Sequence, residues 1–284
     1  MIKVKVPATS ANLGPGFDVL GLAIDRYNIF TFVESAESKE ENLIYKSYRR
    51  VFEYLGKPLI PVKIQVNDNI PIARGLGSSA ACIVGGIMGA NEILGKPLDK
   101  EDILKLATEI EGHPDNVAPA IYGGLVVSVM EGDKIHIAKL PIKNKLNFIA
   151  LVPNFELSTS KAREVLPKRI DFKDGIYNVS RVSILLTALA TGDSGLIKLG
   201  LQDKFHQPYR GKLIEGFDEI ISAVNQKGAL GCYLSGAGPT IMCIGPGEDN
   251  RLIKDIQEYV KDEYPAWEVF VHKVDNIGAL SYID

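Results

Sequence analysis

Between residues 71 and 81 the chain reads Pro71-Ile72-Ala73-Arg74-Gly75-Leu76-Gly77-Ser78-Ser79-Ala80-Ala81, and a run of small apolar residues typical of a helix follows. Gly75 and Gly77 allow the backbone a positive φ, which turns successive N–H groups toward one concavity. The positive end of the following helix adds to that field. The segment therefore predicts a cradle for the phosphates of a nucleotide. The alternative is a plain glycine turn with a serine cap.

This predicted phosphate loop differs from the common nucleotide and hydrolase motifs. A P-loop needs Gly-x4-Gly-Lys-Ser/Thr, a dinucleotide turn needs Gly-x-Gly-x-x-Gly, and an esterase elbow needs Gly-x-Ser-x-Gly; the chain contains none of them. The hydroxyls of Ser78 and Ser79 can cap the helix, contact phosphate oxygens or ligate Mg²⁺. We therefore expect a phosphate loop of another kind.

Three further polar loops are spaced along the chain. Two of them read Ala8-Thr9-Ser10-Ala11-Asn12-Leu13-Gly14-Pro15-Gly16-Phe17-Asp18 and Ser235-Gly236-Ala237-Gly238-Pro239-Thr240. The third, Glu111-Gly112-His113-Pro114-Asp115-Asn116, gathers two carboxylates, an imidazole and an amide into six residues. Carboxylates near a phosphate serve as Mg²⁺ ligands or as a base for an attacking hydroxyl. This third loop is therefore the candidate centre of the chemistry.

Two arginines complete the set of candidate residues. Arg163 ends the segment Leu157-Ser158-Thr159-Ser160-Lys161-Ala162-Arg163, and Arg210 ends Asp203-Lys204-Phe205-His206-Gln207-Pro208-Tyr209-Arg210. A guanidinium fork binds a carboxylate through two parallel hydrogen bonds. Either arginine alone reads as a surface residue, but together they indicate a substrate that carries a carboxylate.

The composition excludes several classes of function. The chain has 284 residues with a net charge of −3, so no broad basic surface favours nucleic acid or an anionic membrane as partner. Its three cysteines lie in apolar runs without CxxC spacing, which predicts free thiols in the cytoplasm and no Cys/His metal site. The oligomeric state stays open, with a homodimer as one alternative.

Predicted strands and helices are mixed along the chain without a strict βαβ alternation, which favours an α+β fold with two lobes, 1–155 and 156–284. We expect a strand at 2–6 that ends at Pro7, and loops at 8–17 and 111–119. A helix over 79–94 contains Gly85, Gly86 and Gly89, which we expect to permit close approach of a neighbouring element. Asp99 is the predicted cap of the next helix.

The motifs together resemble the GHMP kinase superfamily over essentially the whole chain. They appear in its order, as Pro7–Asp18, Pro71–Ala81 and Leu234–Thr240. Within the superfamily they are similar to the homoserine kinases, because the first motif lacks the Pro-Gly-Lys or Pro-Gly-Arg start of mevalonate and galactokinases. Glu111–Pro119 and His206–Arg210 also take the form found in that branch. The resemblance implies a ribosomal-S5-like N-terminal domain, a ferredoxin-like C-terminal domain, and an active site between them.

The same resemblance implies ATP and Mg²⁺ as cofactors and L-homoserine as substrate. Residues Pro71 to Ala81 hold the ATP phosphates, and Ser79 with Glu111 holds Mg²⁺, with Ser78 and Glu109 as the alternatives. Asp115 is the implied catalytic base, accompanied by Asn116 and Asn12. The residues implied to surround the substrate are Asn12, Asp18, His113, Asp115, Asn116, Thr159, Arg163, Arg210 and Gly236.

Other functions stay open at this point. The first is a related kinase that acts on mevalonate or shikimate. The second is a nucleotide-binding module without turnover, which the presence of Ser79, Glu111 and Asp115 disfavours. The third is a phosphatase or lyase on the same fold, because a fold does not determine a function.

Overall fold

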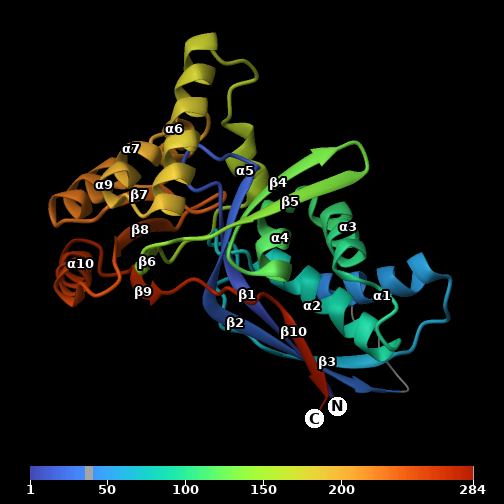
Figure 1. Ribbon diagram of the computed structural model, residues 1–284. Coiled ribbons are helices and arrows are strands. Elements are labelled where there is room, and N and C mark those ends of the chain that lie inside the picture. Colours follow the sequence, from blue (N-terminus) through green and yellow to red (C-terminus); the bar gives the residue numbers. More distant parts are fainter. Residues whose placement is uncertain (36–40, 284) are drawn as a thin grey trace.

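The computed structural model describes residues 1–35 and 41–283 (Figure 1). The first part of the chain forms, in order, β1 (Ile2–Ala11), β2 (Leu20–Glu34), α1 (Leu43–Leu55), β3 (Val62–Asn67), α2 (Ser78–Ile93), α3 (Lys100–Glu111), α4 (Pro114–Tyr122), β4 (Leu125–Glu131), β5 (Lys134–Leu140) and β6 (Leu146–Val152). The remainder forms α5 (Thr159–Glu164), α6 (Phe172–Thr191), α7 (Ile197–Gly200), α8 (Gln207–Arg210), α9 (Phe217–Gln226), β7 (Gly231–Leu234), β8 (Ile241–Pro246), α10 (Asn250–Glu263), β9 (Glu268–His272) and β10 (Leu280–Ile283). Short 3₁₀ helices cover Ser194–Leu196 and Gly211–Leu213.

These strands form two antiparallel sheets. The first has the order β10-β1-β2-β4-β5, with β3 paired to β2, and the second has the order β7-β8-β6-β9. Figure 1 shows α1 to α4 beside the first sheet and α6, α7, α9 and α10 around the second. The predicted two-lobed α+β fold is therefore confirmed. The division at residue 155 stays a prediction; β6 precedes it yet pairs in the second sheet, and β10 returns to the first.

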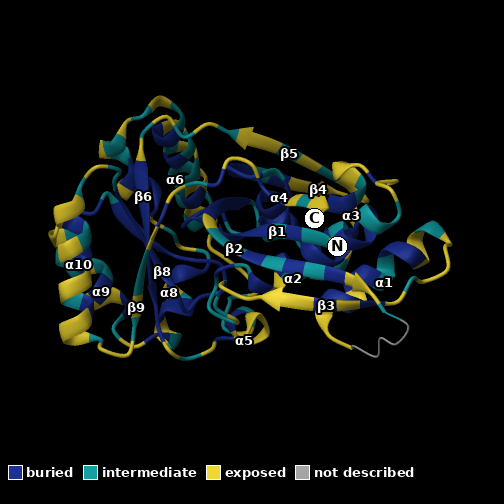
Figure 2. Ribbon diagram, turned by 90° about the horizontal axis from the view of Figure 1, so that it is seen from below, coloured by how far each residue is buried: buried dark blue, intermediate teal, exposed yellow. Residues whose placement is uncertain are grey.

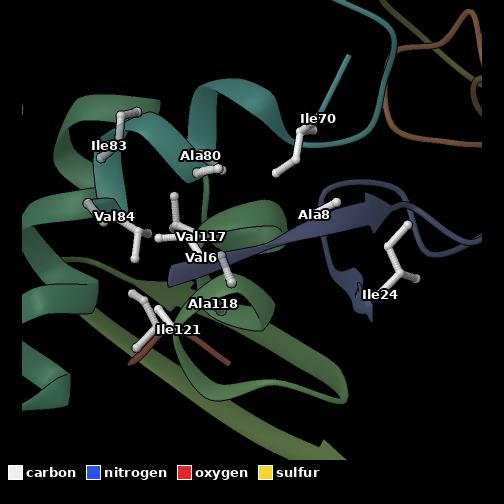
Figure 3. Close-up of a cluster of buried hydrophobic side chains, with 14 of the residues drawn as sticks. Val6, Ala8, Ile24, Ile70, Ala80, Ile83, Val84, Val117, Ala118 and Ile121 are labelled. Carbon is white, nitrogen blue, oxygen red and sulfur yellow. The ribbon is translucent and has the colours of Figure 1, made fainter. Parts of the chain in front are cut away.

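Helices α2 and α4 pack directly on β1, and their small residues make the contact close. Figure 3 shows the apolar side chains of this cluster, including Val6, Ala80 and Val117. A Cβ on Gly85 would lie 2.4 Å from the ring of Phe30, so only glycine permits this approach of α2 to the sheet. Gly86 and Gly89 face equally close atoms of Ile44 and Phe32, at 2.3 and 2.2 Å. The predicted role of the three glycines is confirmed.

The second sheet is covered on both faces. Phe148 and Ala150 of β6 belong to the same apolar cluster as Leu185 of α6, whereas Ile149 and Leu151 pack with residues of α9 and α10. This alternation follows from the two-residue period of a strand. Figure 2 shows β6 and β8 buried and the outer surface of α10 exposed. The loop between β7 and β8 is therefore held at both ends by buried strands of this sheet.

Two local predictions are wrong, and one alternative is excluded. Strand β1 continues through Pro7 to Ala11, because its register with β2 shifts between Pro7 and Ala8, and such an irregularity tolerates the missing N–H. The loop predicted at 111–119 is mostly helix α4, since Pro114 occupies the first helical position, where a proline suits the backbone. The N-cap of α2 is Gly77, and no side chain in the described ranges caps it, so neither serine acts as a cap. Asp99 does cap α3, with a capping box completed by Asp102.

Candidate active site

The glycine-rich loops meet at one place through hydrogen bonds between distant parts of the chain. The N–H of Thr9 donates to the carbonyl of Leu76 at 3.1 Å, and the N–H of Gly236 donates to Ala11 at 3.0 Å. The hydroxyl of Ser235 donates to the carbonyl of Gly75 at 2.6 Å. The predicted phosphate loop, the end of β1 and the β7–β8 loop therefore form a single framework.

The predicted phosphate loop has the geometry of an anion cradle. Gly75 and Gly77 have φ values of +77° and +70°, the left-handed region that favours glycine. A Cβ on Gly75 would lie 2.4 Å from the carbonyl oxygen of Ser235, and one on Gly77 would lie 1.9 Å from Oγ1 of Thr9. Helix α2 starts directly after the loop, and its first turn carries no acidic residue. The N-terminal N–H groups of α2 are thus suited to a phosphate.

Arg74 lies in this loop, but its side chain extends to the segment that directly follows β6. Its Nε donates to the carbonyl of Pro153 at 3.0 Å, and Nη2 donates to that of Asn154 at 2.9 Å. The side chain also forms an ion pair with Glu156 at 3.6 Å and donates to the carbonyl of Ile72 in its own loop at 3.0 Å. The guanidinium therefore anchors the phosphate loop to the second lobe, and only the backbone of Arg74 is left for a nucleotide.

Ser79 and Glu111 form the best candidate pair for Mg²⁺. The hydroxyl of Ser79 is exposed and donates to Oε2 of Glu111 at 2.8 Å, whereas Ser78 is buried. Burial raises the pKa of Glu111, and the hydrogen bond from Ser79 acts in the opposite direction. The alternative carboxylate, Glu109, instead pairs with Arg50 at 3.1 Å.

Within residues 1–35 and 41–283, no group of three or more His, Cys, Asp or Glu side chains could hold a metal ion by itself. Mg²⁺ in phosphoryl-transfer sites keeps several waters and takes one or two carboxylates together with substrate phosphates. One hydroxyl and one carboxylate at the mouth of a phosphate loop fit that requirement. A fully protein-built metal site does not.

The first turn of α4 holds a buried carboxylate with one oxygen engaged. Asp115 is 3% exposed, and its Oδ1 accepts from Nδ1 of His113 at 3.0 Å and from Nδ2 of Asn116 at 3.4 Å. The hydrogen bond to Asp115 raises the pKa of His113. Its Oδ2 makes no hydrogen bond to any described residue. That oxygen is the one able to accept a proton from a ligand.

Asn12 connects two of the loops. Its φ is +72°, and its Nδ2 donates to the carbonyl of Gly236 at 2.8 Å while its Oδ1 accepts from the N–H of Asp18 at 3.0 Å. The side chain is 2% exposed. The structure therefore places Asn12 between the first and third motifs, where its amide holds the loop that carries Asp18.

Two arginines lie beside Asp18 and Phe17. Both Nη atoms of Arg163 donate to the Asp18 carboxylate, the shortest contact being 2.9 Å. Arg210 is 2% exposed and donates to the carbonyls of Ala162 at 3.0 Å and Gly236 at 3.1 Å. The Phe17 ring centroid lies 5.6 Å from the Arg163 guanidinium and 5.0 Å from that of Arg210.

Burial, together with the neighbouring charge of Arg163, lowers the pKa of Arg210 to about 10. A carboxylate ligand would relieve this repulsion, because it would bring a negative charge between two like charges. Thr159, the remaining predicted residue, begins α5 and is exposed; its hydroxyl makes no hydrogen bond in the part of the chain that the structure describes.

The comparisons with known proteins agree with this geometry. Residues 42–124 match the family described as the GHMP kinases N terminal domain, and residues 185–266 match the GHMP kinases C terminal. A mevalonate kinase crystal structure has the same fold, with a TM-score of 0.73 at 19% identity over 96% of this chain and 99% of that one. The fold is that of a GHMP kinase.

Closer relatives narrow this class. The homoserine kinase of Clostridium beijerinckii is 46% identical over 98% of both chains, and that of Clostridium botulinum strain Eklund 17B is 47% identical with the same coverage. The crystal structure of homoserine kinase from Cytophaga hutchinsonii superposes with a TM-score of 0.87 at 32% identity, over 99% of this chain and 97% of that one. The chain belongs to the homoserine kinase family.

Three hydroxyl residues that hold the site together have no role that the sequence alone indicates. Thr9 contacts Asn116, Ser10 contacts Tyr233, and Ser235 contacts both Ser10 and Gly75. All three lie inside the first and third motifs, so the sequence indicates that they are near the site. Their roles depend on hydrogen bonds across more than 100 residues of chain, which no local pattern predicts.

Proposed function

We propose that this chain transfers the γ-phosphoryl group of ATP to the side-chain hydroxyl of L-homoserine and forms O-phospho-L-homoserine. The observation that carries the proposal is the charge arrangement next to the phosphate loop. Asp18 and Arg163 pair with each other, and a bound amino acid would exchange this pair for its own charges, with its ammonium at Asp18 and its carboxylate at Arg163 and Arg210. An amino acid with a free hydroxyl matches both ends of this arrangement, and the family membership supports the same substrate.

In this proposal the backbone of Pro71 to Ala81 holds the ATP phosphates, and Ser79 and Glu111 would hold the Mg²⁺ that neutralises their charge. The homoserine hydroxyl oxygen bonds to the γ-phosphorus while the bond from that phosphorus to the bridging oxygen of ADP breaks. The hydroxyl proton passes to Oδ2 of Asp115. Transition states of this type are loose, so positioning and charge neutralisation provide most of the acceleration.

The other side chains position the acceptor. Asn116 and His113 orient Asp115, and Asn12 holds the Asp18 loop against Gly236. We assign the substrate contacts to Asn12, Asp18, His113, Asp115, Asn116, Thr159, Arg163, Arg210 and Gly236.

No helix among the described residues is long and apolar enough to cross a membrane. The three cysteines are free thiols, which supports the prediction that the enzyme works in the reducing cytoplasm. The threonine pathway is the biosynthetic setting that this product implies.

The direct test measures ADP release with MgATP and a panel of acceptors: L-homoserine, L-serine, L-threonine, mevalonate and shikimate. We expect the highest kcat/KM with L-homoserine and a loss of roughly 10- to 200-fold with L-serine, which is one methylene shorter. A higher kcat/KM with mevalonate or shikimate would identify a different kinase of the superfamily. ADP release that no acceptor stimulates would instead support a nucleotide-binding module.

A further inference from the structure

Thr9 occupies an unusual position between two functional loops. It lies in β1, has no exposed surface, and its N–H donates to the carbonyl of Leu76 in the phosphate loop at 3.1 Å. Its hydroxyl donates to Oδ1 of Asn116 at 2.8 Å. One residue thus contacts the loop that cradles the phosphate and the helix start that carries Asp115.

Thr9 and Asp115 together hold the Asn116 amide, one on each side. Because Oδ1 accepts from the Thr9 hydroxyl, Nδ2 faces Oδ1 of Asp115, 3.4 Å away. In the reversed orientation, the amide oxygen would face the carboxylate, and two acceptors would meet without a proton between them. The Asp115 carboxylate therefore selects this orientation of the amide, and the Thr9 hydroxyl holds the amide in place by donating to its oxygen.

The phosphate loop is fitted closely around the same side chain. A Cβ on Gly77 would lie 1.9 Å from Oγ1 of Thr9, so the glycine leaves the space that this side chain occupies. Ser10 cannot replace it, because successive strand residues point to opposite sides. The Ser10 hydroxyl indeed lies against Tyr233 and Ser235, in the second lobe.

We propose that Thr9 is a positioning residue for phosphoryl transfer. It sets the distance and orientation of Asn116 and Asp115 relative to the phosphate loop, through one backbone hydrogen bond and one side-chain hydrogen bond. The inference rests on the proposed function and adds to it the residue that couples the donor end of the site to the acceptor end.

The test compares Thr9→Val, which keeps the shape without the hydroxyl, with Thr9→Ser, which keeps the hydroxyl. Thr9→Val leaves Asn116 without its donor, so we expect kcat to fall about 5- to 150-fold. The KM for ATP should change less than about threefold, because the backbone bond to Leu76 remains. Thr9→Ser should recover most of kcat.

A double-mutant cycle separates positioning from general destabilisation. If Thr9 acts through Asn116, adding Thr9→Val to Asn116→Ala should lower kcat by less than about twofold more, since coupled residues are not additive. The matched control is Thr108→Val in α3. It removes the same atoms from a buried threonine whose hydroxyl has no partner within residues 1–35 and 41–283, and should leave kcat unchanged.

Wild-type kcat in Thr9→Val, equal losses in the valine and serine variants, or additive effects with Asn116→Ala would each overturn the inference. A failure of the proposed function has a different signature, because wild-type protein would then release no ADP with any amino-acid alcohol. The inference about Thr9 would then fail together with the proposed function. Melting temperatures of all variants check that the folded protein is being compared.

Discussion

The two ends of the candidate site are made from different parts of the polypeptide. At the phosphate end, glycines and the start of α2 present main-chain N–H groups, and the only large charged side chain, Arg74, points into the second lobe. At the acceptor end, the groups are side chains: Asp115, Asp18 and two arginines. A backbone-built end tolerates few changes of shape, whereas a side-chain-built end depends on charge.

The largest expected effect tests the backbone end. Gly75→Ala places a Cβ 2.4 Å from the Ser235 carbonyl at a φ of +77°, so the loop must move. A displacement of this size at a reacting site can cost about 10²-fold, and we expect at least that loss in kcat/KM for ATP. Steady-state kinetics with varied ATP, together with calorimetric nucleotide binding, measure it.

Gly95→Ala is the matched control for this change. Gly95 has nearly the same φ, +79°, but no atom of the described chain lies within 4 Å of a Cβ placed there. It should lose roughly 1–2 kcal/mol of stability from the left-handed conformation and keep its activity. Equal loss of activity in both variants would show that strain, and not the contact with Ser235, explains the effect.

The second effect tests the carboxylate at the boundary between the two ends. Asp115→Asn keeps the size of the side chain and removes the free Oδ2 acceptor, so kcat should fall by about 10²-fold or more if general base catalysis operates. The KM for ATP should stay close to wild type. A decrease in kcat below about threefold would leave Asp115 with an orienting role only.

The third effect tests the charges of the acceptor end. Arg210→Ala should raise the KM for L-homoserine by a factor that corresponds to roughly 1.5–3 kcal/mol, because a charge-assisted contact to the substrate carboxylate is lost. The KM for ATP should change far less. Since Arg210 also binds the carbonyls of Ala162 and Gly236, Arg210→Lys serves as control: it keeps the charge without the fork. Equal changes in both KM values would count against the assigned role.

The smallest effect concerns stability alone. Burial lowers the pKa of His206, which lies beside Asp203, Arg210 and Asp18 and bonds to the carbonyl of Gly14 at 2.7 Å. Its neutral form is favoured in the folded protein, so its stabilising contribution is complete above the unfolded pKa of about 6.5 and is lost as the pH falls below it. Urea unfolding between pH 7.5 and 5 should show a shallower pH slope for His206→Gln than for wild type. Identical slopes would contradict this origin of acid sensitivity.

Much of the fold could be predicted because local signals were strong. The role of the glycines in α2 and the cap at Asp99 both follow from the chemistry of short segments. The wrong predictions arose where contact with a neighbouring element overrode the secondary structure that the local sequence favours. Pro7 sits inside β1 because the register with β2 shifts there, and Pro114 starts a helix that packs on β1.

The sequence by itself determined the phosphate loop, the order of the motifs and the residue types of the site, because glycine conformations, helix ends and ionisable groups act over a few residues. Tertiary structure alone decided which groups are engaged and which are free. It pairs Arg163 with Asp18, turns Arg74 away from the site and places Thr9 between Leu76 and Asn116. Those contacts join segments separated by dozens to more than a hundred residues, and only the packing of two lobes brings them within hydrogen-bonding distance.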